Sequence, residues 1–148
     1  MATRCIIAEP YGDGWRGRYS HWDGYPTVKV PQLTELVLRD GVEKVRKVLL
    51  HDHLSWSVID PDYKRREGTE WKYVKGYGEA HTDISSVKWF TQDDYNFAWA
   101  EYVYVLGDKA LFVWQINGRG YSDGDRTLSF VGEHRYDLPP VLDKVLVR

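Results

Sequence analysis

The side chains best suited to ligand binding or catalysis are most concentrated in the octet 19–26, Tyr-Ser-His-Trp-Asp-Gly-Tyr-Pro. His21 titrates near neutral pH, and the carboxylate of Asp23 could orient its ring. Trp22 and Tyr25 offer ring faces on which a planar ligand could stack. Side chains of these types, at the end of a strand and the start of a tight turn, suit a binding site or acid–base catalysis.

Two arginines, Arg16 and Arg18, come just before the octet. Arginine pairs with phosphate through charge-assisted hydrogen bonds, and aromatic rings stack on nucleobases. We therefore predict a site for a small, planar, anionic ligand, formed by Arg16, Arg18, Tyr19, His21, Trp22, Asp23 and Tyr25. In the alternative interpretation the octet is structural: its rings anchor the core, and its histidine donates to a backbone carbonyl.

The octet and a later segment together resemble a family of small uncharacterised proteins of phages and actinobacteria. Its members share a strand that ends in Tyr-x-His-Trp-Asp-Gly-Tyr-Pro and a later Glu-Tyr-x-Tyr-Val strand. The residues that match are Tyr19, His21, Trp22, Asp23, Gly24, Tyr25, Pro26, Glu101, Tyr102, Tyr104 and Val105. The family pattern has a Gly-rich turn where this chain has Thr-Val-Lys-Val at 27–30, so the resemblance does not extend to that turn. It implies a phage or prophage context and no particular activity.

A second candidate site lies around His51-Asp52-His53, with His81 farther along the chain. Two histidines at i and i+2 point the same way on a strand and could bind zinc with a third ligand such as His81. On a helix, however, the same two side chains diverge by about 200°. Because the preceding residues have helical periodicity, we predict no metal site, and no motif indicates a cofactor.

Charge and cysteine content narrow the classes of function. The formal net charge is -2, so no global positive field attracts nucleic acid, which is the less favoured partner. The single cysteine, Cys5, lies in an apolar run without an activating histidine, which favours a buried thiol in a reducing compartment. No apolar stretch approaches the roughly 20 residues that span a bilayer. We expect a cytoplasmic protein without a membrane partner, in the host cytoplasm if it is phage-encoded.

The elements that must position the octet begin with a predicted hairpin. Strands over Thr3–Ala8 and Arg16–Trp22 flank a turn-rich stretch at 11–14. Pro31 then opens a short helix that carries Leu33, Leu36 and Val37 on one face. A second helix follows from a capping box at 40–43, with an apolar stripe of Val42, Val45, Val48 and Leu49.

The second half of the chain alternates loops and strands. Residues 57–78 are expected to form a long excursion with a short strand at 71–74. A last strand is predicted at 127–131 and an amphipathic helix at 137–147.

A second hairpin is predicted over 101–116, with Gly107 first in a two-residue turn and Leu106 paired with Lys109. One face of this hairpin carries Tyr102, Tyr104, Leu111 and Val113, and the other carries Val103, Val105, Ala110, Phe112 and Trp114. Both faces are apolar, so both must be covered. Helices can cover one face, and a loop, a ligand or a partner subunit the other, so the chain is expected to be a monomer or a homodimer.

The predicted fold is one α+β domain over residues 1–148, a small, mostly antiparallel sheet with two or three helices packed on one face. Within the chain, 7 Trp and 11 Tyr make an aromatic excess that suits an interface or a ligand pocket. The first hypothesis is a non-enzymatic phage or prophage accessory protein that binds a host protein or a small nucleotide-like anion.

Two other functions stay open at this point. One is a hydrolase that uses His21 and Asp23, with or without His51, His53 or His81. The other is a nucleic-acid-binding protein, with Trp71 or Tyr73 as the stacking residue and with the basic residues Arg16, Arg18, Lys64, Arg65 and Arg66.

Overall fold

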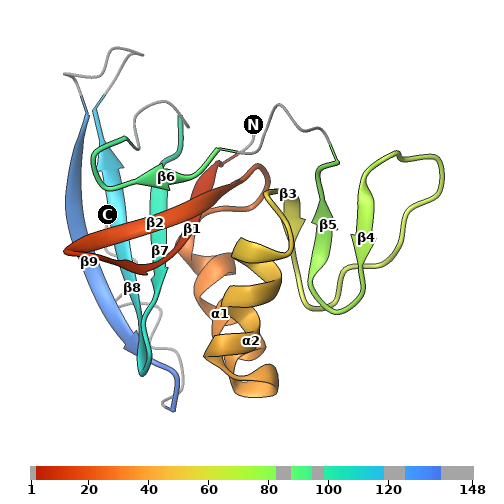
Figure 1. Cartoon of the computed structure of the whole chain (residues 1–148), viewed down its shortest axis with the longest axis horizontal. Coiled ribbons are helices and arrows are strands. Elements are labelled where there is room, and N and C mark those ends of the chain that lie inside the picture. The colour runs from red at the N-terminus through yellow and green to blue at the C-terminus, as the bar shows by residue number, and fades with distance from the viewer. Residues whose placement is uncertain (1–2, 83–87, 95–98, 119–125, 138–148) are drawn as a thin grey trace.

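The computed structural model describes residues 3–82, 88–94, 99–118 and 126–137 (Figure 1). In chain order the elements are β1 (Cys5–Tyr11), β2 (Gly14–Ser20), α1 (Pro26–Asp40), α2 (Val42–Arg46), a π-helical turn η1 (Lys47–His51), β3 (Ser55–Ile59), β4 (Lys72–Val74), β5 (Gly78–Ala80), β6 (Phe90–Thr91), β7 (Tyr102–Leu106), β8 (Ala110–Asn117) and β9 (Thr127–Arg135).

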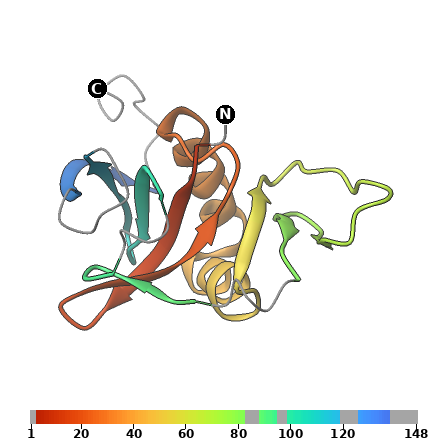
Figure 2. The same ribbon diagram turned by 90° about the horizontal axis from the view of Figure 1, so that it is seen from above.

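All of these strands belong to one mixed sheet, in the order β4-β5-β3-β2-β1-β7-β8-β9, and β6 pairs with β2. Two neighbouring pairs are parallel, β1 with β7 and β2 with β3. The helical segment 26–51 is the crossover that carries the chain from β2 to the parallel β3. β8 and β9 lie at one end of the sheet, and the β4–β5 arm extends from the other (Figures 1 and 2).

The predicted fold class is wrong. The described residues form nine strands of one mixed sheet, and of the two α-helices α2 is little more than one turn. Sheet therefore dominates over helix. The sequence pattern missed this because β3, β5 and β6 are short strands, of five, three and two residues, inside polar or irregular segments. It also has no means of showing that β1 pairs in parallel with the distant β7.

The predicted first hairpin is confirmed, since β1 and β2 pair antiparallel from Cys5↔Ser20 to Tyr11↔Gly14. The predicted start of the first helix is wrong. α1 begins at Pro26, where a missing N–H costs no hydrogen bond, and Pro31 lies inside it. The octet therefore leads directly from a strand into a helix.

The predicted capping box at 40–43 is also wrong, because α2 starts from Gly41 without a side-chain cap. Asp40 instead accepts hydrogen bonds from Arg39 and from the hydroxyl of Tyr77. These bonds fix the end of α1 to the loop before β5. They also explain the pKa of the Asp40 carboxyl, which is lowered to about 2.

The second hairpin, β7–β8, has the predicted faces and a different register. Leu106 pairs with Leu111, so the turn centres on Asp108 and Lys109. The residue of β8 that pairs with Leu106 is therefore two positions later than predicted. Because side chains alternate between the two faces with a period of two, this shift moves no residue to the other face. Tyr104 and its neighbours belong to the core cluster that includes α1, and Val103 belongs to a second cluster on the opposite face.

Two further predictions concern the segments around this core. The short strand expected at 71–74 is present as β4, and the last strand is present as β9, which extends to Arg135. The predicted C-terminal helix lies outside the described residues. Among the helices of the described part, none combines the length and the apolar character needed to cross a membrane.

Candidate functional site

The octet is a tightly held junction between β2 and α1. The backbone N–H groups of His21 and Trp22 donate to the carbonyls of Trp56 and Ser57, each at 3.0 Å. Gly24 donates to Thr3 at 2.8 Å, and a Cβ on Gly24 would stand 2.6 Å from that same carbonyl oxygen. A side chain does not fit there, so the glycine of the octet is needed for packing.

The structure does not join His21 to Asp23. The Nδ1 atom of His21 lies 2.6 Å from the hydroxyl of Tyr19, and the described residues show no hydrogen bond between His21 and Asp23. Desolvation and the positive charge of Arg4 lower the pKa of His21. The imidazole is therefore mostly neutral at neutral pH and has a tyrosine, not a carboxylate, as its partner.

The remaining octet side chains divide between core and surface. Tyr25 is half-buried and packs against the larger core cluster, so it has a structural role. Trp22 is 46% exposed and, with Asp23, lines a cleft of about 270 Å³ completed by Ser57, Val58, Tyr63, Arg66 and Glu79. We call these seven residues the Trp22 cleft.

The charges of the Trp22 cleft are poorly suited to an anion. Arg66 donates from Nη2 and Nε to the carboxylate of Glu79, at 2.6 and 3.3 Å, and Tyr63 donates to the same carboxylate at 3.0 Å. The arginine is thus already paired with a carboxylate. Asp23 adds a negative charge without a hydrogen-bond partner among the described residues.

Arg16 and Arg18 lie elsewhere, because their side chains leave β2 on the face opposite Tyr19. The guanidinium of Arg16 lies between two rings, 4.3 Å from the centroid of Tyr11 and 4.5 Å from that of Trp89. Its Nε donates to Glu9 at 2.9 Å. Its two terminal amino groups hydrogen-bond to no described residue, although the side chain is fixed on three sides.

Arg18 continues this stack toward the interior. Its guanidinium lies 3.4 Å from the Trp89 centroid, and its Nε donates to the carbonyl of Leu50 at 2.9 Å. Burial first, and the neighbouring charge of Arg16 second, lower the pKa of Arg18 to about 10. The guanidinium is still charged at neutral pH, so the stack carries two cations.

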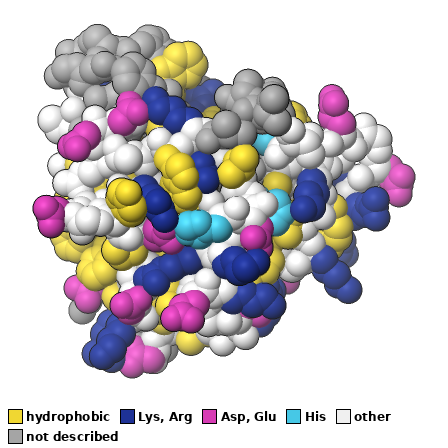
Figure 3. Space-filling model, in the orientation of Figure 1, with side chains coloured by type: hydrophobic (Ala, Val, Ile, Leu, Met, Phe, Trp, Pro, Cys, Tyr) yellow, Lys and Arg dark blue, Asp and Glu magenta, His cyan; other side chains and the backbone are white. Residues whose placement is uncertain are grey.

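Glu9 and His51 complete the group. The Glu9 carboxylate is nearly buried and lies 3.0 Å from Nε2 of His51, which comes from the π-helical turn. We call Glu9, Tyr11, Arg16, Arg18, His51 and Trp89 the arginine–aromatic cluster. Dark blue and yellow side chains alternate around a histidine near the middle of the face in Figure 3.

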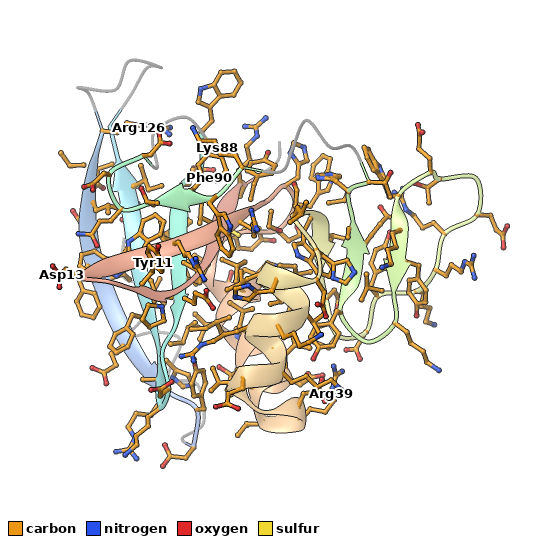
Figure 4. The ribbon with its side chains drawn as sticks, viewed as in Figure 1. Tyr11, Asp13, Arg39, Lys88, Phe90 and Arg126 are labelled. Atoms are coloured by element: carbon orange, nitrogen blue, oxygen red, sulfur yellow. The ribbon has the colours of Figure 1, made fainter. Side chains whose placement is uncertain are left out.

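A cavity of about 380 Å³ adjoins this cluster at Tyr11. It lies between the tip of the β1–β2 hairpin and the turn after β6, and is lined by Tyr11, Gly12, Asp13, Gly14, Trp15, Thr91, Gln92 and Asp93. We call it the hairpin cavity. Figure 4 shows Tyr11 on the hairpin, Phe90 of β6 above it, and Asp13 projecting at the tip.

The other histidines do not assemble into a metal site. His53 bonds to the Val48 carbonyl and to Lys72, and His81 bonds to the hydroxyl of Ser55. Within the described ranges no three His, Cys, Asp or Glu side chains are grouped so as to hold a metal ion.

Sequence reasoning missed Glu9, Tyr11 and Trp89. The first two could have been found, because the hairpin register pairs Glu9 with Arg16, and alternation then brings Tyr11 to the same face. Trp89 reaches the site through the pairing of β6 with β2, which no local pattern indicates. Lys64, Arg65 and Arg66 belong to the loop before β4, so they do not join Arg16 in one basic patch.

Comparison of the chain with protein-family models, with curated proteins and with solved structures finds no match in any of the three.

Proposed function

We propose that this chain is a non-enzymatic, cytoplasmic accessory protein that binds a small nucleotide-like anion at the arginine–aromatic cluster. The observation that carries the proposal is the state of Arg16. Two rings and a carboxylate fix its guanidinium, while its terminal amino groups have no acceptor among the described residues. A fixed guanidinium with free donors suits a phosphate, because little side-chain entropy is lost on binding.

The surroundings of Arg16 support a ligand with a planar part. Tyr11 is 55% exposed and lines the hairpin cavity, so a ring bound there would extend the existing stack. Base–aromatic stacking contributes about 1–3 kcal/mol per base. The cavity volume of about 380 Å³ lies within the range of small-molecule sites.

A phage or prophage context for this activity rests on the resemblance of the octet and of the Glu-Tyr-x-Tyr-Val strand to the phage family. In that context the protein would sequester a host nucleotide.

Isothermal titration calorimetry with nucleoside monophosphates, diphosphates and triphosphates tests the proposal. Arg16→Gln should weaken binding at least tenfold, because hydrogen bonds to a charged group contribute about 1.5–3 kcal/mol. Tyr11→Ala should weaken it similarly through lost stacking. The matched control is Arg135→Gln on β9, which removes an exposed arginine paired with Asp137 at 2.8 Å and should leave affinity unchanged. Absence of binding by every nucleotide would refute the proposal.

Single-stranded nucleic acid is the second candidate, because the alternating rings and guanidinium groups also suit successive bases and phosphates. An oligonucleotide would then bind more tightly than any mononucleotide, and its affinity would fall steeply with added salt. The hydrolase hypothesis with His21 and Asp23 has less support, since His21 is hydrogen-bonded to Tyr19 and the described residues show no hydrogen bond between His21 and Asp23.

A further inference from the structure

The wall of the hairpin cavity formed by the turn after β6 carries polar groups that have no hydrogen-bond partner among the described residues. The carboxamide of Gln92 and the carboxylate of Asp93 are exposed and make no hydrogen bond to any described residue. The neighbouring Asp94, in contrast, is paired with Lys88 at 2.8 Å. One side of the cavity therefore offers an amide donor next to a carboxylate acceptor.

The opposite wall is shaped to bring Gln92 close to the backbone. Gly14 lies on β2 beneath it, and a Cβ on Gly14 would stand 2.7 Å from the Oε1 atom of Gln92. The absence of a side chain at this position thus leaves room for the carboxamide. The backbone N–H of Gln92 also donates to the Trp15 carbonyl at 3.3 Å, which ties the turn to the hairpin.

Trp15 adds a second unsatisfied donor to the residues of this cavity. Its indole is 4% exposed, and its Nε1–H has no acceptor in the described part of the chain. A buried donor without a partner is rare in folded proteins, because leaving it unpaired costs free energy. The Nε1 atom is itself buried, so a ligand in the cavity does not reach it without a rearrangement of the cavity wall, and this donor is not part of the recognition surface.

We infer that the hairpin cavity selects a guanine base, which deepens the proposed nucleotide binding and rests on it. Guanine presents a carbonyl acceptor at O6 beside donors at N1 and N2. The carboxylate of Asp93 accepts from the two donors, and the amide of Gln92 donates to O6. Adenine places a lone pair at N1, which a carboxylate repels, and cytosine and uracil offer less area for stacking on Tyr11.

The distribution of charge orients such a ligand. Asp13 and Asp93 place negative charge at the end of the cavity near the hairpin tip, and this charge repels a phosphate. Arg16 does not line the cavity, and it places positive charge 4.3 Å from the centroid of the Tyr11 ring. The base therefore lies at the carboxylate end and the phosphate at the arginine end, with Tyr11 between them.

The test compares GMP, IMP, AMP, CMP and UMP by isothermal titration calorimetry on the full chain. GMP should bind about tenfold more tightly than AMP or better, because a site built for hydrogen bonding rejects an analogue that leaves its polar groups unpaired. IMP lacks the N2 amino group and should fall between the two. Asp93→Asn should remove most of the preference for GMP over AMP.

Asp62→Asn is the matched control, since it removes the same charge from an exposed loop residue outside the cavity. It should preserve the GMP preference. If all five nucleotides bind equally and Arg16→Gln weakens each of them, the guanine inference is wrong and the proposed function stands. If none of them binds, both are wrong. Retention of the full GMP preference in Asp93→Asn would also overturn the inference.

Discussion

The hydroxyl of Tyr104 makes a hydrogen bond that holds the octet in place. The variant Tyr104→Phe tests that role. Tyr104 is fully buried and donates to the Gly24 carbonyl at 2.6 Å. The variant removes one oxygen and leaves a buried carbonyl without this donor. A buried group left unsatisfied costs about 1–3 kcal/mol, which is a large part of the 5–15 kcal/mol that stabilises a typical domain.

Tyr102→Phe is the matched control, because Tyr102 lies two residues away on the same strand and stacks on Tyr104 at 6.3 Å. Its hydroxyl makes no hydrogen bond within the described residues. Urea unfolding should show that the free energy of unfolding falls by about 1–3 kcal/mol in Tyr104→Phe. In Tyr102→Phe it should fall by less than about 0.5 kcal/mol. Hydrogen exchange at the amide of Gly24 should accelerate only in Tyr104→Phe. Equal unfolding midpoints in the two variants would refute this account of the octet.

Three further predictions concern the core and the octet. The pKa of His21 in the folded chain lies below its ordinary 6.5, so the unfolded chain binds the proton more readily. The free energy of unfolding should therefore fall as the pH drops below about 6.5. Urea titrations of His21→Asn should lack the part of this pH dependence that comes from His21. Gly17→Ala would place a Cβ 2.3 Å from the carbonyl oxygen of Ile7. Calorimetry should therefore show that the free energy of unfolding falls by about 1–3 kcal/mol. An unchanged Tm would contradict this close approach of β2 to β1. Burial raises the pKa of Cys5 to about 12, so a thiol reagent at pH 8 should label the unfolded chain at once and the folded chain only as fast as it opens.

Local sequence patterns predicted the parts of the fold that depend on neighbouring residues. The turn at 11–14 was predictable because glycine accepts the positive φ that Gly12 adopts, 57°. The faces of β7 and β8 were predictable from alternation, even though the turn centre was misplaced. Proline signals were ambiguous, since both Pro26 and Pro31 could open a helix and only the structure shows which one does.

Contacts between residues that are distant in the sequence were not predictable from local patterns. The site prediction grouped residues by their closeness in the chain, whereas β2 separates them in space. Adjacent strand residues point to opposite faces, so Arg18 and Tyr19 contact different surroundings. The partners that give Arg16 its fixed orientation come from β1 and from the segment before β6.

The length of β2 therefore argues against one ligand that contacts all seven predicted residues. The hairpin cavity lies at the Gly14 end of this strand, and the Trp22 cleft lies beyond the Ser20 end. Six residue steps along a strand span about 20 Å, which is longer than a mononucleotide. The two sites also differ in charge, because among the described residues the terminal amino groups of Arg16 have no acceptor and the carboxylate of Asp23 has no donor. Trp22→Ala should consequently leave nucleotide affinity unchanged in the same titration in which Arg16→Gln weakens it, and a joint loss would mean that the two sites are coupled.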